Sequence, residues 1–238
     1  MGFFDIFGGG SKVERLIKAI TQKFGPPENR QKALNQLAEM EEPEAIAALL
    51  RRFTIQVDPG ITDREEKDFT YRAIVDKGEK AVEPLKAFVL NSDTGIAWGL
   101  KALNALIPPP DLAEHCIATL KKVGNDYTRD PEKKVVLLNQ LLELDDPRIG
   151  EAVIPFLEDP ADEVKIGTAR VLSKTPTEAG RVALLEGLVR DQDKKRVVSA
   201  LVEAISVGKF TVEGYREKVA PLISDPFALQ KDGTVLHK

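Results

Sequence analysis

The chain has 238 residues, 30% of them charged, and a net charge of −4 at pH 7. Both signs are mixed along the sequence, so no strong overall field attracts a polyanion and bulk nucleic-acid binding is disfavoured. One cysteine, Cys116, excludes an intrachain disulfide framework and fits a reducing compartment. No run approaches the roughly 20 apolar residues of a membrane span, and the N-terminus lacks the features of a secretion signal. We therefore expect a cytoplasmic protein.

Residues 1–10 form a segment of their own, in which the large apolar residues Phe3, Phe4, Ile6 and Phe7 precede three glycines. The glycines predict a flexible joint. The apolar residues have two interpretations. They could fold back as a lid over the first helix pair, because the end of a helical stack exposes apolar surface. Alternatively, they could dock on a partner's groove or on a membrane surface.

From Ser11 onward the sequence predicts helices joined by short turns. Ser11 with Glu14 and Thr62 with Glu65 have the spacing of helix caps. Pro155 lies inside an expected helix and should kink it. The longest expected interruption is 54–62, and a proline run at 108–110 is a rigid stop. The expected helices span residues 11–24, 28–40, 44–53, 63–77, 79–90, 93–107, 111–123, 131–144, 151–157, 164–172, 177–190, 194–207 and 212–223.

A two-residue motif recurs every 33 to 35 residues in the second helix of each expected pair. Each copy has an apolar residue followed by a small polar one. A fixed period of this kind is typical of stacked supersecondary units. The copies are Leu34-Asn35, Phe69-Thr70, Leu103-Asn104, Leu138-Asn139, Leu172-Ser173 and Ile205-Ser206.

The clearest repeat, 152–159 followed by 164–172, resembles a HEAT-like repeat of the armadillo type. It has a proline in the first helix, an acidic turn, and a second helix in which a branched residue precedes Lys165 and small residues follow. The resemblance covers roughly residues 11–223. It implies an all-α, right-handed α-solenoid of about six to seven helix pairs over 11–225, whose second helices line a concave face that holds macromolecules. Val198 replaces the basic residue in the next copy, so the acid-to-base contacts between repeats should be incomplete.

The recurring asparagines Asn35, Asn104 and Asn139 are candidate partner contacts. In the related armadillo repeats, an asparagine on the inner helix fixes the main chain of an extended peptide, because one amide both donates and accepts hydrogen bonds. The tryptophan of the armadillo pattern is missing here, and small residues also suit tight helix packing. We favour packing and keep the peptide-binding row as the alternative.

Trp98 and a basic run are further candidates. Core packing is the favoured role of Trp98, with a contact on the concave face as the alternative. The densest basic run is Lys194-Lys195-Arg196, and Lys133-Lys134 has the same place in another repeat. We favour a solvated face for both runs, and a strip that contacts an acidic partner is the alternative.

Enzymatic chemistry finds little support in the residues. The HEAT-like iron hydroxylases bind metal through repeated His-Glu pairs, whereas neither His115 nor His237 is followed by Glu. His115 and Cys116 are adjacent, so on a helix their side chains diverge by about 100° and make a poor metal site. HEAT-like DNA glycosylases need a basic concave surface with aromatic side chains, whereas this chain has a net charge of −4 and one tryptophan. We therefore expect no enzyme activity, metal or cofactor.

The C-terminal tail, 226–238, has the pattern of short strands in place of helical periodicity. Asp232-Gly233 lies between two short apolar runs, which predicts a β-hairpin with a two-residue turn. We expect this hairpin to cap the last helix, and strand addition to a partner's sheet is the alternative.

Together these features predict a non-catalytic scaffold or adaptor that binds a protein, of unspecified identity, through its concave helices. Two alternatives stay open: an accessory enzyme resembling the HEAT-like bilin lyases, which would hold a tetrapyrrole, and a structural subunit of a larger assembly.

Overall fold

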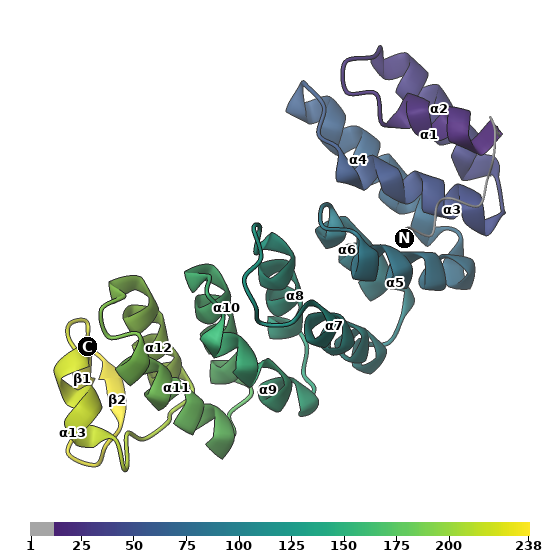
Figure 1. The fold of residues 1–238 in the computed structure, drawn as a ribbon. Helices are drawn as coiled ribbons and strands as arrows, with labels where there is room; N and C mark the ends of the chain where they lie inside the picture. Colours follow the sequence, from purple (N-terminus) through teal and green to yellow (C-terminus); the bar gives the residue numbers. More distant parts are fainter. Residues whose placement is uncertain (1–11) are drawn as a thin grey trace. The chain divides into compact units, whose positions relative to one another are not determined.

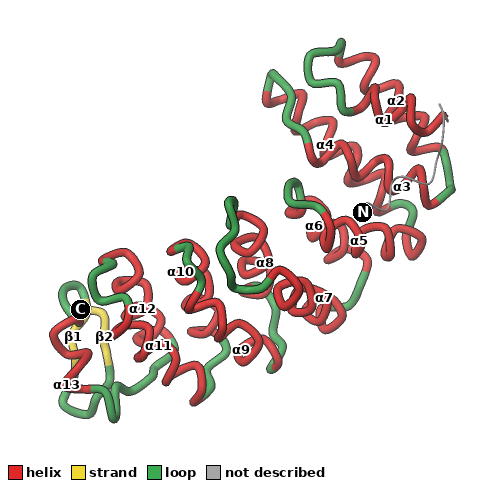
Figure 2. Tube along the Cα trace, viewed as in Figure 1, coloured by secondary structure: helices red, strands yellow, loops and turns green. Residues whose placement is uncertain are grey.

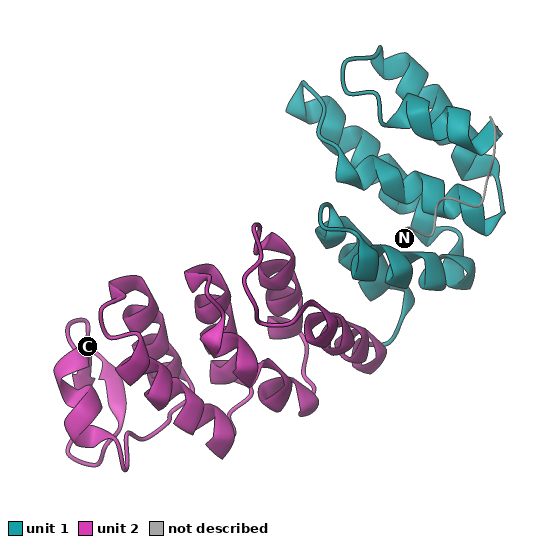
Figure 3. Cartoon of the chain, viewed as in Figure 1, with its two compact units in different colours: residues 1–108 teal, residues 109–238 magenta. Residues whose placement is uncertain are grey.

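The computed structural model describes residues 12–238, which form thirteen α-helices, four short 3-10 helices and a C-terminal two-stranded hairpin (Figure 1; Figure 2). The helices follow one another in sequential pairs. The chain divides into two compact units, residues 1–108 and 109–238 (Figure 3). The division falls inside the proline run at 108–110, where the sequence predicts a stop.

In unit 1 the helices pair as α1 with α2, α3 with α4 and α5 with α6. We call the earlier member of each pair the first helix and the later member the second helix. Second helices also contact one another, α2 with α4 and α4 with α6, and first helices do the same. The elements are α1 (Lys12–Ile20), α2 (Pro27–Glu39), α3 (Pro43–Leu50), η1 (Arg51–Thr54), α4 (Gly60–Val75), η2 (Gly78–Ala81), α5 (Val82–Asn91) and α6 (Ile96–Leu106).

Unit 2 repeats this arrangement, with α8, α10 and α12 as successive second helices in contact. The α-helix α9 gives way to a 3-10 turn at the residue before Pro155, since proline removes a backbone donor. The elements are α7 (Pro109–Val123), α8 (Glu132–Leu142), α9 (Arg148–Val153), η3 (Ile154–Glu158), α10 (Asp162–Lys174), α11 (Glu178–Arg190), α12 (Lys195–Val207), α13 (Arg216–Val219), η4 (Ala220–Leu222), β1 (Phe227–Leu229) and β2 (Val235–His237).

The apolar member of the recurring motif forms the core beneath the second helices in five of its six copies. These side chains are fully buried, because each second helix packs against its own first helix and against the neighbouring second helices. They are Leu34, Leu103, Leu138, Leu172 and Ile205.

The sixth copy, on α4, corrects the expected register. Phe69 is only half-buried, while Thr70 is fully buried and its hydroxyl donates to the Glu66 carbonyl oxygen at 2.7 Å. That bond satisfies the hydroxyl, so the threonine can occupy the core position. The motif is therefore shifted by one residue on α4, and Tyr71 takes the place that the asparagines hold elsewhere.

Several helix ends also differ from the predictions. The first helix ends at Ile20 instead of residue 24, and α4 begins at Gly60, so Thr62 lies inside the helix and does not cap it. The expected helix over 212–223 is reduced to α13 and η4, because Thr211 forms a bridge with Thr234 of the hairpin.

The helix expected over 93–107 begins at Ile96, and Gly95, which precedes it, has a φ of +73°, which L side chains rarely adopt. A Cβ at this position would lie 2.2 Å from the carbonyl oxygen of Phe53. The turn between α5 and α6 can therefore lie this close to η1 only because residue 95 is a glycine.

The hairpin pairs β1 with β2 in the antiparallel register Phe227↔His237, Ala228↔Leu236 and Leu229↔Val235. Its turn is not the predicted two-residue type. Of its residues only Gly233 has positive φ, and its amide donates to the Gln230 carbonyl oxygen, which is typical of a three-residue loop that ends in glycine. Val235 is buried and β2 contacts α12, whereas the expected last helix over 212–223 meets the hairpin through Arg216 of α13, which donates to the carbonyl oxygens of Gln230 and Lys231. Strand addition to a partner's sheet stays a prediction.

Candidate functional site

The three recurring asparagines lie on the solvent side of second helices. Asn35 on α2, Asn104 on α6 and Asn139 on α8 are all exposed, and each directly follows a buried leucine. Exposed amides do not pack between helices, so the packing interpretation that we favoured is wrong. Asn35 and Asn104 belong to unit 1, whereas Asn139 belongs to unit 2.

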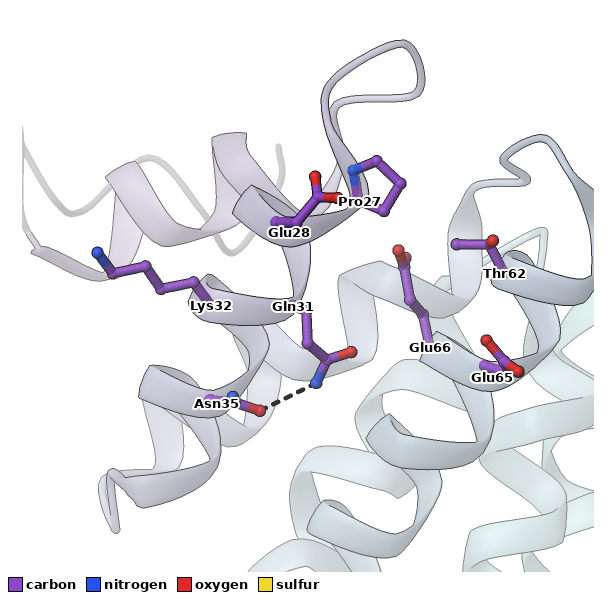
Figure 4. A pocket seen from close by; sticks show the side chains of 8 residues that line it. All are labelled: Pro27, Glu28, Gln31, Lys32, Asn35, Thr62, Glu65 and Glu66. Carbon is purple, nitrogen blue, oxygen red and sulfur yellow. Dashed lines mark hydrogen bonds between the residues drawn. The ribbon is translucent and has the colours of Figure 1, made fainter.

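A hollow of about 500 Å³ lies in unit 1 between the starts of the second helices α2 and α4. Figure 4 shows Gln31 between the two helices, where its amide donates to the Asn35 side-chain oxygen at 2.9 Å, while Lys32 points away from α4. The two amides keep further donors and acceptors available to a ligand. The residues that line the hollow are Pro27, Glu28, Gln31, Lys32, Asn35, Thr62, Glu65 and Glu66.

One residue that lines this hollow, Glu66, belongs to a buried charge cluster. The Glu66 carboxylate accepts hydrogen bonds from Arg30 on α2 at 3.0 Å and from Arg52 of η1 at 2.7 Å. All three side chains are 4% exposed or less. Both guanidiniums also donate to loop carbonyl oxygens, including those of Gly25 and Ile55. The cluster thereby fixes the turn before α2 and the loop before α4.

Asp63 extends the cluster at the start of α4. Burial acts to raise the pKa of this carboxyl, but hydrogen bonds from Lys67, Arg52 and the Val57 amide outweigh burial and hold the pKa below its usual value. Asp63 is therefore charged at neutral pH and pairs with Arg52 at 2.8 Å.

A second hollow, of about 340 Å³, lies between α4 and α6 and is lined by Trp98. The indole is half-buried and stacks on Phe53, with ring centroids 5.5 Å apart and planes 13° apart. Trp98 therefore packs on one side and borders open space on another, and its role as a contact on a concave face stays a prediction. The lining residues are Arg64, Asp68, Ala97, Trp98 and Lys101.

The basic runs of unit 2 are not equivalent. Lys133 and Lys134 are both buried, so a solvated face is wrong for this run. In the other run, Lys194 pairs with Asp162 at 2.9 Å and Arg196 with Glu163 at 3.5 Å, whereas Lys195 is exposed. Two of its three charges therefore link α12 to α10.

Two buried lysine–aspartate pairs connect neighbouring helix pairs in unit 2. Lys134 donates to Asp159 at 2.6 Å, and Lys165 donates to Asp191 at 2.5 Å. Burial acts to raise the pKa of Asp191, but Lys165 and Arg190 hold it below its usual value. In the next second helix, α12, Val198 stands where the sequence pattern has a basic residue. An uncharged side chain cannot form a third pair of this kind, so the series of lysine–aspartate pairs stops at Lys165.

Cys116 is a buried residue of α7, where burial raises the pKa of its thiol to about 12. Its neighbour His115 is half-buried. Among residues 12–238 no group of three or more His, Cys, Asp or Glu side chains is placed to hold a metal ion.

Sequence reasoning missed several exposed apolar side chains that lie between a first and a second helix or in the first turn of a second helix. Phe24, Ile61 and Tyr127 are 98%, 73% and 78% exposed. Phe24 and Ile61 lie just before Pro27 and Thr62, which line the larger hollow. A signal was present, because each lies beside turn-forming Gly, Pro, Asn or Asp residues outside the helical periodicity.

The apolar cluster Phe3, Phe4, Ile6 and Phe7 lies outside the described residues, so both of its interpretations stay predictions. Within the described chain, none of the helices combines the length and apolar character needed to cross a bilayer.

Three comparisons with known proteins gave no relative. No protein-family model, no curated protein and no solved structure matches the chain.

Proposed function

We propose that the protein is a non-catalytic scaffold that binds another protein along the exposed side of its second helices. We call this side the second-helix face; in unit 1 it is formed by α2, α4 and α6. We further propose that the helix pairs are HEAT-like repeats of an α-solenoid. The sequential pairing of helices and the buried lysine–aspartate pairs between repeats support that architecture.

The observation that carries the proposal is the position of the two hollows. Both lie between consecutive second helices of unit 1 and are open to solvent. Both are lined by side chains of the kinds that proteins use to bind peptides. Gln31 and Asn35 offer amides that suit a main chain, and Trp98 offers an aromatic anchor. Asn104 continues the exposed amides onto α6.

Affinity capture from the source cell's lysate, with the retained protein identified by mass spectrometry, would supply the partner for a binding assay. Replacing Asn35 and Asn104 together by Ala should then weaken binding by about thirtyfold, because each of the two lost hydrogen bonds contributes about 1 kcal/mol. Asn91→Ala is the matched control, since Asn91 is an exposed asparagine on the first helix α5. Equal losses in both variants, or none in either, would overturn the proposed face.

A chain that lacks residues 2–9 separates the second-helix face from the N-terminal apolar cluster. If the partner stays bound to this chain and is lost from the double asparagine variant, the second-helix face holds it. Loss of the partner from the shortened chain alone would transfer the main contact to Phe3, Phe4, Ile6 and Phe7.

A further inference from the structure

The ammonium group of Lys101 lies close to two aromatic rings and one carboxylate, groups that attract a cation. Its Nζ is 4.4 Å from the ring centroid of Tyr71 and 4.6 Å from that of Trp98. The nearest carboxylate, Asp68, is 3.7 Å away. Aromatic faces attract cations because their quadrupole is negative above the ring, and paired rings with a carboxylate recur in sites for ammonium ligands. Two adjacent second helices thus supply a complete cation site.

Lys101 occupies this site loosely. Its side chain is 53% exposed and that of Asp68 is 39% exposed, so water screens their attraction. The lysine stem is flexible, and rotation about its bonds would carry the ammonium into solvent. Arg64 is the other charged residue at this hollow; it is 83% exposed and 3.8 Å from Asp68. None of these contacts holds the cation firmly.

There is room for a second occupant. Lys101, Trp98 and Asp68 all line the hollow of about 340 Å³, together with the exposed Ala97. Trp98 is braced from behind, because it stacks on Phe53, which in turn contacts Phe88 at a centroid distance of 6.4 Å. The aromatic wall therefore keeps its position when Lys101 moves away.

We propose that Tyr71, Trp98 and Asp68 form a binding site for a cationic side chain, lysine or arginine, of the partner protein. Lys101 is the internal occupant that the partner's cation displaces. This inference rests on the proposed protein-binding function and names the chemistry that one part of the second-helix face recognises. An internal occupant lowers the apparent affinity by the fraction of time that it fills the site.

Trp98 is the only tryptophan of the chain, so its fluorescence reports on this site directly. We would titrate the full chain with Nα-acetyl-lysine methylamide and follow that emission. Two comparison probes are the norleucine analogue, which lacks the ammonium, and the glutamate analogue, which is anionic. Lys101→Ala should bind the lysine probe about fivefold more tightly than the wild type, as expected for a site whose occupant has been removed. Asp68→Asn in the Lys101→Ala background should abolish the preference for lysine over norleucine.

Lys80→Ala is the matched control, since Lys80 is a similarly exposed lysine of unit 1 that pairs with Glu41, and its titration should equal that of the wild type. Unchanged affinity in Lys101→Ala, or equal binding of lysine and norleucine, would overturn the proposal. Stronger binding of the glutamate probe would show that Arg64 and Lys101 form an anion site instead. If these titrations fail while the double asparagine variant still loses its partner, the binding face stands and only the cation site falls.

Discussion

At the scale of single residues, Glu66 holds an unusual position. A buried carboxylate accepts hydrogen bonds from two buried guanidiniums, Arg30 and Arg52, in a cluster that closes two loops of unit 1. The attraction offsets the cost of burying these charges only while all the partners are present. Removing the charge of Glu66 would leave Arg30 buried without a carboxylate partner and Arg52 paired with Asp63 alone.

We therefore expect Glu66→Gln to lower the free energy of unfolding of unit 1 by about 3 kcal/mol. Glu65→Gln is the matched control, because its neighbour Glu65 is exposed, and we expect it to change stability by less than about 0.5 kcal/mol. Urea unfolding followed by Trp98 fluorescence measures both. Equal stability of the two variants would show that the cluster does not hold unit 1 together.

Residue exposure was the part of the site that the sequence predicted least well. A small polar residue after an apolar one is compatible with a buried position between helices and with a solvent-facing position. For Asn35 only the orientation of the helix in the structure shows that the side chain is exposed. The fate of Lys134 could not be read from its charge, since its partner Asp159 is 25 residues away along the chain. Lys101 was missed because Tyr71 meets it only across two helices.

At the scale of elements, buried lysine–aspartate pairs link successive helix pairs of unit 2. The Lys165–Asp191 pair joins α10 to the turn that precedes α12, and Asp191 also pairs with Arg190. Because the pKa of folded Asp191 lies below its unfolded value, the carboxylate stabilises the fold at every pH above that unfolded value. This stabilisation is lost as the pH falls through the lower, folded pKa.

Asp191→Asn should cost about 3 kcal/mol at pH 7, because it leaves Lys165 buried without its partner. The difference in unfolding free energy between this variant and the wild type should narrow as the pH falls below the unfolded pKa of Asp191 and through its lower folded pKa, where the wild type loses the same contribution. Urea unfolding followed by far-ultraviolet circular dichroism at several pH values tests this. Asp193→Asn, at an exposed site in the same turn, should follow the wild type throughout; a gap that stays constant with pH would contradict the assignment.

Helix existence was largely predictable, whereas helix starts were not. Apolar periodicity depends on many side chains, so most of the expected helices are present. Starts depend on single residues. Asp130, Asp146 and Asp159 each precede a proline and accept a hydrogen bond from the amide two residues on, at the starts of α8, α9 and α10. This aspartate–proline signal was readable in the sequence at all three positions.

At the scale of the whole molecule, each unit has a core built mainly from elements close together in the sequence. Stability in such chains is set by neighbouring contacts, so unfolding need not be a single transition. Trp98 reports on unit 1 alone, whereas circular dichroism reports on the helices of both units.

We expect the urea transitions from these two signals to differ in midpoint. Glu66→Gln should shift the fluorescence transition and leave a separate dichroism phase unchanged. Coincident transitions that shift together in the variant would show that the 238 residues unfold as one cooperative body.

The turn at Gly95 has a consequence for how binding would vary among related sequences. Any side chain there would press on the Phe53 backbone, and Phe53 supports the indole of Trp98. A substitution at position 95 would therefore distort the cation site from behind while touching no ligand. Selection for binding would then favour glycine at position 95 because it has no side chain. A comparison limited to residues that contact the ligand would miss this position.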